Sequence, residues 1–544
     1  MGAKEKMNKK LFGMLVCILF LSSISFHATG IVDSNNSYII GGWTETTKLI
    51  ASDGGTNDRF GSSVSIDGND AIIGAYFDDV SSQINAGSAY VFVYSGSAWT
   101  QQARLTASDA ATDDEFGTSV DICGDYAIVG SPYDDDSGTS SGSAYIFYRS
   151  GTAWTQQTKL IPADGAAGDK FGQSVSIDGN VVIVGAPGKS SNQGFSYTFT
   201  RSGSVWTQQA KLGAAGSTGL GFSVSISGDV VVMGAYGTNS NTGAAHIYEW
   251  YSSSWWGPYT LTASDGILYD LFGDSVSIDQ DYIAVGAPGH DLGSGSEGAT
   301  YIFEKPGSGW ADMTETQKII ASDNEGGDGF GQSVSVDGEV IIVASPNEDG
   351  TGIARGASYI FDRGASSWSE VTKLTASDAS NDDYFGWGVS ISGNIAIVGA
   401  YAEDNTNGNE AGSAYIFEWT NEAPSPPEID GKTSGEAGTS YEYSFTSTDP
   451  DGDEISYYIK WGDNEITDWT DFQASATEYT ESHTWDDEGT YTIEAKAKDT
   501  YGAESEWSTL KIEMPVIKLY QKPILLFLEN HPHLFLIIRY LLDI

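Results

Sequence analysis

Cysteine and histidine are both scarce in this chain. Of 544 residues only Cys17 and Cys123 are cysteines, and Cys17 lies in an N-terminal segment that we expect to be removed. One remaining thiol cannot form an intramolecular disulfide, so packing or a bound metal must stabilise the fold. The six histidines include only His246 and His290 between residues 43 and 420. We expect His246 to face a core and His290 to be exposed, and we predict no enzyme.

Basic residues are few. The chain has 26 lysines and arginines against 74 acidic residues, which gives a formal net charge of −48. Such a surface repels nucleic acid and anionic lipid, and it attracts divalent cations or basic partners. We therefore expect no nucleic-acid binding. The alternative is that the acidity only keeps a secreted protein soluble, or adapts it to high salt.

Long apolar runs are also missing. An apolar stretch follows four lysines near the N-terminus and ends in small residues, which predicts a signal peptide over residues 1–28 and a secreted or cell-surface protein. The tail, residues 515–544, has two apolar stretches, 524–528 and 534–542, and each is shorter than the roughly 20 residues that span a bilayer. We expect the tail to attach the protein to a membrane, an envelope or a partner, or else to cover part of the domain before it.

A repeat fills the chain between Trp43 and Trp419. Each copy opens with Phe-Gly, continues as an alternating strand, a tight turn and an apolar run that ends in Gly-Ala-Pro or a variant, and then gives an aromatic strand and a fourth strand that begins at a tryptophan. Four short strands per copy, without helical periodicity, are typical of propeller blades. The opening pairs are Phe60-Gly61, Phe116-Gly117, Phe171-Gly172, Leu220-Gly221, Phe272-Gly273, Phe330-Gly331 and Phe385-Gly386.

The order of strands at the two ends predicts how the ring closes. The repeat region begins with a lone fourth strand and ends after a third strand, so residues 43–50 should complete blade seven. We predict an all-β protein with a linker at 29–42 and a seven-bladed β-propeller at 43–420. One tryptophan per blade at a fixed place indicates packing, and Cys123 should be a half-buried structural thiol.

The Phe-Gly and Gly-Ala-Pro landmarks resemble the FG-GAP repeat of the integrin α-subunit propeller and its prokaryotic relatives. The resemblance implies a binding protein that meets its partners with one face of the propeller. Calcium in integrin α-subunits lies in long loops between strands one and two; those turns are too short here, so these ligands do not carry over. The face that carries the acidic loops corresponds to the face with which integrin propellers meet partners.

Two sets of acidic residues recur in the loops. One set lies seven and two residues before Phe-Gly, and the other lies between strands two and three. Because turns alternate between the two rims of an antiparallel blade, both sets should share one rim. The first set is Asp53, Asp58, Asp109, Asp114, Asp164, Asp169, Asp265, Asp270, Asp323, Asp328, Asp378 and Asp383. The second is Asp78, Asp79, Asp134, Asp135, Asp136, Asp291, Glu348, Asp349, Glu403 and Asp404.

These acids admit two interpretations. Paired aspartates with loop carbonyls are ligands for calcium, so the first set is a candidate metal site and the second a candidate partner-binding rim. Aspartates in turns also bind their own backbone, and the aspartate two residues before the buried phenylalanine would then cap the loop. Catalysis needs unlike groups at one place, whereas these carboxylates repeat around a ring.

Three prolines at residues 421–427 predict a linker, and residues 428–514 alternate like a small β-sandwich. Trp461-Gly462-Asp463, His483-Thr484-Trp485 and Gly489-Thr490-Tyr491 resemble the polycystic kidney disease (PKD) domain, with Asn464 in place of its usual glycine. Such domains are immunoglobulin-like spacers of prokaryotic, especially archaeal, surface proteins. Its Asp449–Asp453 run is a candidate calcium loop, but its glycine and the downstream Lys460 break the EF-hand pattern, so we favour a plain acidic turn.

These features together predict an extracellular or cell-surface adhesion protein whose acidic rim contacts a surface protein, a matrix polymer or a glycan, with calcium as a candidate cofactor. A structural component of the cell envelope is the alternative. A secreted enzyme that acts on polysaccharide is a third, less favoured hypothesis. It would need one blade with unlike catalytic residues, whereas only blade four diverges and it does so by losing acids.

Overall fold

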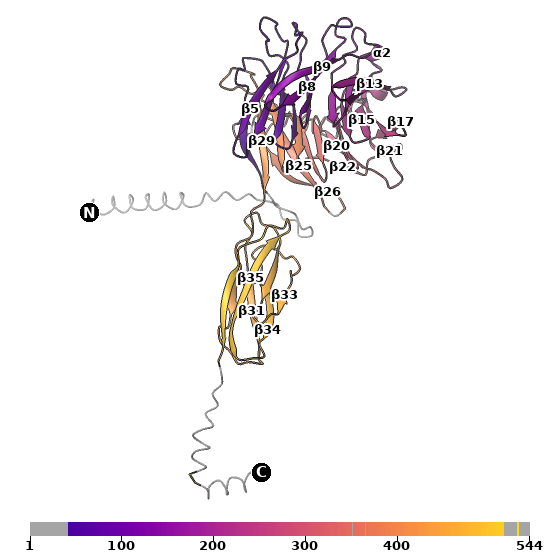
Figure 1. Cartoon of the computed structure of the whole chain (residues 1–544). Helices are drawn as coiled ribbons and strands as arrows, with labels where there is room; N and C mark the ends of the chain where they lie inside the picture. The colour runs from indigo at the N-terminus through magenta and orange to yellow at the C-terminus, as the bar shows by residue number, and fades with distance from the viewer. Residues whose placement is uncertain (1–41, 351, 365, 516–529, 532–544) are drawn as a thin grey trace, which may run out of the picture. The chain divides into compact units, whose positions relative to one another are not determined.

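The computed structural model describes residues 42–515, except 351 and 365, together with residues 530–531 (Figure 1). The predicted signal peptide lies outside this range, as do almost all of the linker 29–42 and of the tail 515–544. The described chain is nearly all β, as predicted. Seven sheets follow one another from residue 42 to residue 420, antiparallel except for one short pairing, and two further sheets lie between residues 428 and 514.

The first three blades each contain four consecutive strands. Blade one has β2 (Phe60–Asp67), β3 (Asp70–Ala75), β4 (Ser88–Tyr94) and β5 (Trp99–Leu105); blade two has β6 (Ser119–Cys123), β7 (Tyr126–Ser131), β8 (Ser143–Ser150) and β9 (Ala153–Leu160); blade three has β10 (Val175–Asp178), β11 (Val181–Ala186), β12 (Phe195–Ser202) and β13 (Val205–Leu212).

Blades four to six keep this order with one irregularity. Blade four has β14 (Val224–Ser227), β15 (Val230–Gly234), β16 (Ala245–Tyr251) and β17 (Ser254–Thr262); blade five has β18 (Val276–Asp279), β19 (Tyr282–Ala287), β20 (Ala299–Glu304) and β22 (Gln317–Ile319); blade six has β23 (Val334–Asp337), β24 (Val340–Ser345), β25 (Ala357–Arg363) and β26 (Trp368–Leu374). The fourth strand of blade five is thus short, and the preceding β21 (Met313–Thr314) pairs in parallel with β17 of blade four.

Blade seven contains both ends of the repeat region. Its strands β27 (Phe385–Ser392), β28 (Ile395–Ala400) and β29 (Ser413–Thr420) are completed by β1 (Gly42–Leu49), which pairs antiparallel with β29 from Gly42 opposite Thr420 to Leu49 opposite Ala414. The order of strands in the sequence predicts this pairing. The first described strand therefore has its hydrogen-bonding partner at the far end of the repeat region.

A circle of hydrogen bonds joins the seven inner strands. In each blade one side chain accepts a backbone N–H of the next blade, and the last bond returns to blade one. The donors and acceptors are Ile122 to Ser65, Ile177 to Asp121, Ile226 to Ser176, Ile278 to Ser225, Val336 to Ser277, Ile391 to Ser335 and Ile66 to Ser390. The propeller is closed by these contacts between neighbouring blades.

Both residues of the Phe-Gly pair contribute to packing. Phe60 is buried and meets the rings of Tyr90 and Phe92 edge-on, at centroid distances of 5.5 and 6.0 Å. Gly61 has φ 93°, and a Cβ there would lie 2.2 Å from the carbonyl oxygen of Ser413 in the neighbouring blade. A side chain at this position would push two blades apart, which explains why the glycine recurs.

Two loops between strands two and three contain a short turn. The four-residue segments α2 (Lys189–Asn192) and α3 (Thr238–Asn241) each include residues with positive φ, so their backbone is left-handed rather than that of a regular helix. Cys123 is half-buried, as predicted, and burial raises the pKa of its thiol.

The second part of the chain is a two-sheet sandwich. One sheet contains β30 (Glu428–Gly431), β31 (Ser440–Thr446) and β34 (Tyr479–Thr484); the other contains β32 (Ile455–Lys460), β33 (Ile466–Thr467), β35 (Gly489–Asp499) and β36 (Ser508–Met514). Trp461 and Trp485 lie in its buried core with Phe445 and Tyr457. Residues of the predicted linker are hydrogen-bonded to the sandwich, since the backbone N–H of Ser425 donates to the carbonyl of Thr448.

Candidate functional site

Each of six blades holds a group of polar side chains on the rim formed by the loops that precede strand one and those that join strands two and three. We call this group the rim cluster. It comprises the two aspartates before Phe-Gly, the side chain three residues after Gly-Ala or its variant, a tyrosine on strand three and a base on strand four. In blade two its members are Asp109, Asp114, Asp134, Tyr145 and Lys159.

The base of the cluster binds the aspartate seven residues before Phe-Gly. It stands directly opposite the tyrosine in the pairing of strands three and four, and this register aims its charged end at the rim. The nitrogen to carboxylate distances are 2.9 Å for Arg104–Asp53, 2.7 Å for Lys159–Asp109, 2.6 Å for Lys211–Asp164, 2.7 Å for Lys318–Asp265, 2.6 Å for Lys373–Asp323 and 2.7 Å for Lys48–Asp378. The base of blade seven, Lys48, comes from β1.

The buried tyrosine of each cluster donates its hydroxyl to a carboxylate. In five blades the acceptor is the same aspartate that binds the base: Tyr145–Asp109 at 3.1 Å, Tyr197–Asp164 at 2.8 Å, Tyr301–Asp265 at 2.9 Å, Tyr359–Asp323 at 2.8 Å and Tyr415–Asp378 at 2.8 Å. In blade one Tyr90 donates to Asp78 instead, at 2.7 Å. Carboxylate, hydroxyl and ammonium thus form one connected network in each blade.

The aspartate two residues before Phe-Gly closes the loop that it belongs to. Its carboxylate accepts the backbone N–H of the residue three positions earlier, and the aspartate is buried in all six blades. The distances are 2.5 Å for Asp58, 2.7 Å for Asp114, Asp169, Asp270 and Asp328, and 2.5 Å for Asp383. Burial raises the pKa of Asp58 and of Asp114 to about 6, against the lowering effect of this hydrogen bond. The capping interpretation accounts for this geometry.

The side chain three residues after Gly-Ala or its variant differs between blades but is always buried. It is an acid in blades one, two, six and seven, where the same base also binds it: Arg104–Asp78 at 2.6 Å, Lys159–Asp134 at 2.8 Å, Lys373–Glu348 at 2.8 Å and Lys48–Glu403 at 2.6 Å. In blade three it is Lys189, which binds Asp169 at 2.7 Å.

His290 takes this place in blade five, and it corrects our expectation of an exposed residue. The side chain is only 4 % exposed, and its Nδ1 lies 2.9 Å from a carboxylate oxygen of Asp270. The loop folds the ring back onto the blade, which the sequence of the loop does not reveal. His246 is buried, as predicted.

The remaining acids of the second set mainly shape their own loops. Each of four aspartates that directly follow the cluster position accepts a backbone N–H five or six residues further on: Asp79 from Asn85, Asp135 from Ser140, Asp349 from Ala354 and Asp404 from Glu410. Asp291 accepts the N–H groups of Gly293 and Gly295, and Asp136 binds Lys159 at 2.5 Å. Both acidic sets therefore lie on one rim, as the alternation of turns predicts.

Blade four replaces the whole cluster with neutral groups. His246 stands where the other blades have tyrosine, and Thr260 stands opposite it where they have the base. The ring contacts Ser217 at 2.9 Å and Thr260 at 3.3 Å, and burial lowers the pKa of His246 to about 4. Acid and base disappear together from this blade, which indicates that they work as a pair.

These contacts bear on the candidate calcium ligands. One oxygen each from Asp109, Asp134 and Asp136 lies within 4.8 Å of the others, a spacing suited to a metal ion. The ammonium of Lys159 binds all three carboxylates at 2.5 to 2.8 Å. Calcium at the first set stays a prediction, and the structure provides every one of these aspartates with a protein partner. The recurring lysine before leucine on strand four is visible in the sequence. The repeat pattern, however, indicates only that a strand ends there and does not predict the ion pair.

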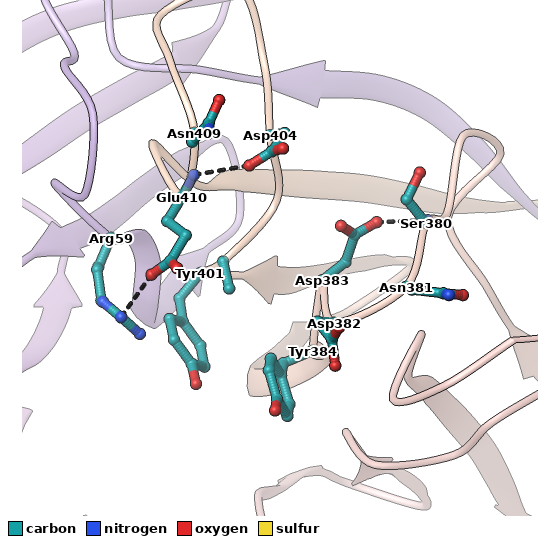
Figure 2. A pocket seen from close by; sticks show the side chains of 11 residues that line it. Arg59, Ser380, Asn381, Asp382, Asp383, Tyr384, Tyr401, Asp404, Asn409 and Glu410 are labelled. Carbon is teal, nitrogen blue, oxygen red and sulfur yellow. Dashed lines mark hydrogen bonds and ion pairs between the residues drawn. The ribbon is translucent and has the colours of Figure 1, made fainter.

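A pocket of about 600 Å³ lies on the same rim, between the two long loops of blade seven (Figure 2). It is lined by Asp382, Asp383 and Tyr384 of one loop, by Tyr401, Asp404 and Glu410 of the other, and by Arg59 of blade one, among others. Arg59 binds Glu410 at 2.5 Å and lies over the ring of Tyr401 at 4.8 Å. Four carboxylates against one guanidinium make this pocket acidic.

The described residues include no helix that is long and apolar enough to cross a membrane. A model of the PKD domain matches residues 421–514. Among solved structures, the chain is similar to the PKD domain of an M14-like peptidase from Thermoplasmatales archaeon SCGC AB-540-F20, with 49% identity over 18% of this chain and 99% of that one and a TM-score of 0.18. It is also similar to the PKD domain of the human VPS10 domain-containing receptor SorCS2, with 13% identity over 18% and 77% of the two chains and a TM-score of 0.15. No curated protein matches.

The repeat region matches a family model seven times, at residues 43–92, 99–147, 154–199, 206–248, 257–303, 313–361 and 368–417, which together exceed half of the chain. Each match begins with the fourth strand of one blade and continues through three strands of the next. FG-GAP repeats and PKD domains are typical of extracellular adhesion and surface proteins. The chain belongs to the FG-GAP repeat family and carries a PKD domain after its seven repeats.

Proposed function

We propose that this protein is an extracellular or cell-surface adhesion protein that binds its partner in the acidic pocket of blade seven. The observation that carries the proposal is the pocket itself, about 600 Å³ with a lining of mostly acidic, tyrosine and asparagine side chains. Polar groups that converge in a concave site fix the orientation of a bound ligand.

The lining indicates what kind of group the partner presents. Carboxylate oxygens accept hydrogen bonds, so a fitting ligand donates them, either as hydroxyl groups of a glycan or as basic side chains of a protein. The net charge of −48 favours encounter with a basic partner. Arg59 is already bound to Glu410, which leaves acid in excess in the lining.

The proposal includes no catalytic step and no calcium in the propeller. The carboxylates of the rim clusters repeat from blade to blade with a base and a tyrosine, so most of them lack the distinct surroundings that acid-base catalysis requires. We infer that these aspartates hold the blades and loops in place. Calcium would have to displace the base from the aspartates seven residues before Phe-Gly and a backbone N–H from those two residues before it.

The test compares Asp404→Asn with Asp79→Asn. These residues occupy equivalent places in blades seven and one, and each closes its loop through one backbone N–H, but only Asp404 lines the pocket. Both variants, and the unchanged protein, are tested for binding to arrayed glycans and to basic surface proteins. We expect Asp404→Asn to weaken binding at least tenfold and Asp79→Asn to leave it unchanged.

Equal loss in both variants would contradict a site in the pocket. Dependence on ionic strength then separates the two kinds of partner, because salt screens a charged partner and hardly affects a neutral glycan. Self-association of the protein without any binding would support the alternative, a structural component of the cell envelope.

A further inference from the structure

A second group of acids lies in the PKD domain and is built differently from the rim clusters. The loop from Asp449 to Asp453 joins β31 to β32, and one carboxylate oxygen each of Asp449, Asp451 and Asp453 lies within 4.8 Å of the others. Asp499, at the end of β35, and Asn421, the first residue of the matched domain, lie beside this loop. We call these five residues the sandwich acid group.

Backbone and amide N–H groups bind some of the oxygens of this group, and the N–H of Glu422 donates to Oδ2 of Asp451 at 2.6 Å. Oδ1 of Asp449 accepts the N–H groups of Asp451 and Asp453 at 2.9 and 3.1 Å, and Oδ1 of Asp499 accepts those of Tyr501 and Ala503, both at 2.9 Å. The amide nitrogen of Asn421 donates to Oδ2 of Asp499 at 2.8 Å. These contacts fix the orientation of both carboxylates and of the amide.

Two oxygens of the group, one on Asp449 and one on Asn421, are buried and have no donor among the described residues. Asp449 is 6 % exposed, and within the described chain no group donates to its Oδ2. The same holds for the amide oxygen of Asn421. A buried acceptor without a donor costs about 1–3 kcal/mol, and more when it is charged, so two such oxygens beside further carboxylates require a positive partner.

The protein does not supply that partner as it does in the propeller. In the part of the chain that the structure describes, no lysine, arginine or histidine forms an ion pair with Asp449, Asp451 or Asp499, whereas every rim cluster that contains acid contains a base. The carboxylates of the sandwich acid group thus lie close together, and no base forms an ion pair with Asp449, Asp451 or Asp499 in the described chain.

We propose that the sandwich acid group binds one calcium ion, with oxygen ligands from Asp449, Asp451, Asp453 and Asn421. All four ligand atoms are oxygens, and three of them belong to carboxylates. Hard divalent cations prefer such ligands, and calcium accepts them in irregular geometry. Asp499 positions Asn421 through its amide nitrogen. The ion would fix the first residue of the domain to the Asp449–Asp453 loop. This site is independent of the pocket in blade seven.

Calorimetric titration of the intact protein with calcium chloride, after removal of metal by a chelator, tests the proposal. We expect one saturable site per chain, with Asp449→Asn weakening it at least tenfold. Asn421→Ala keeps the whole acidic loop, so it serves if Asp449→Asn fails to fold, and it should weaken binding severalfold. Asp109→Asn removes one carboxylate from the three grouped carboxylates of the propeller and should leave calcium binding unchanged.

Thermal unfolding gives a second readout. At a calcium concentration of about 100 times Kd, the transition of the PKD domain should rise by roughly 10 °C or more, since the bound ion stabilises only the folded state. Titration with magnesium chloride should show weaker binding, because magnesium requires nearly ideal octahedral geometry. Absence of saturable calcium binding to the unchanged protein would overturn the proposal, and so would undiminished binding in both Asp449→Asn and Asn421→Ala.

Discussion

The rim clusters of the propeller and the sandwich acid group of the PKD domain contain similar carboxylates, but different side chains surround them. In blade two Asp109, Asp134 and Asp136 surround the ammonium of Lys159. In the PKD domain Asp449 keeps a buried oxygen without a donor among the described residues. The difference teaches that the spacing of acids does not identify a metal site, and that the residue on the facing strand must also be known.

Blade four makes the same point inside the propeller. It has lost the aspartates, the tyrosine and the base together, and His246 with Ser217 and Thr260 fills their place with neutral hydrogen bonds. A base without its acids, or acids without their base, would leave a charge poorly compensated next to the core. Blade four therefore lacks the aspartates and the base that binds them together.

Replacing Lys159 by methionine should convert a rim cluster into an uncompensated acid group. Loss of one partner from a buried ion pair costs about 3–5 kcal/mol, so the propeller should unfold at clearly lower denaturant concentration. Calcium should restore part of the loss, because three grouped carboxylates become available. Urea unfolding with and without calcium measures both effects.

The matched control for that change is the double variant Lys159→Met with Asp109→Asn. Removing one of the acids as well should recover part of the stability, as expected for coupled residues in a double-mutant cycle. Additive losses in the double variant would show that lysine and aspartate act independently, and the comparison between the two regions would then fail.

The pH dependence of stability should separate the capping aspartates from the ion-paired ones. Burial raises the pKa of Asp58 from 3.8 to about 6. Its contribution to stability is therefore complete below pH 4 and is lost as the pH rises through 6, an effect of at most about 3 kcal/mol. As the pH rises from 4 to 7, the free energy of unfolding of Asp58→Asn should increase relative to that of the unchanged protein, as measured by denaturant titration.

Asp378 provides the opposite case in blade seven. Burial favours its neutral form, but hydrogen bonds from Lys48 and Tyr415 outweigh this and lower its pKa. Its stabilising effect is present above pH 3.8 and is lost as the pH falls further. Asp378→Asn should therefore be destabilising at pH 7 and nearly neutral at pH 3; the same trend as for Asp58→Asn would contradict the division of roles.

Introducing a base into blade four, which lacks the aspartates, tests whether the base depends on its acids. Thr260→Lys places an ammonium opposite His246, where the blade has no aspartate at the positions that bind the base elsewhere. We expect a loss of roughly 2 kcal/mol, because the carboxylates that bind the base in the other blades are absent and the nearby Asp312 already accepts the backbone N–H of Thr260. Thr260→Val is the control for size, and a smaller loss in Thr260→Lys than in Thr260→Val would refute the argument.

The smallest effect is expected at the edge of the cluster in blade two. Asp136 is 41 % exposed at its side chain and shares Lys159 with two other acids. Exposed ion pairs contribute about 0–1 kcal/mol, so Asp136→Asn should shift the unfolding midpoint only slightly. A loss as large as that of Lys159→Met would mean that the outer acid, and not the buried Asp134, dominates the cluster.

Much of the architecture is predictable from local pattern. The Phe-Gly landmark recurs because Gly61 and its equivalents have no room for a side chain, and the strand order at the two ends requires β1 to join blade seven. The alternation of turns places both acidic sets on one rim. These features depend on chain order and on residue size, which a sequence displays directly.

The roles of the acids depended on contacts between segments far apart in sequence. Lys48 binds Asp378 only because the ring closes, and His290 is buried only because its loop folds back toward Asp270. A carboxylate has the same appearance in a sequence whether an ammonium, a backbone N–H or a metal ion faces it. The sequence thus determined the blades, the closure of the ring and the acidic rim, while the tertiary structure decided which charge faces which, because electrostatic pairing depends on distances in space.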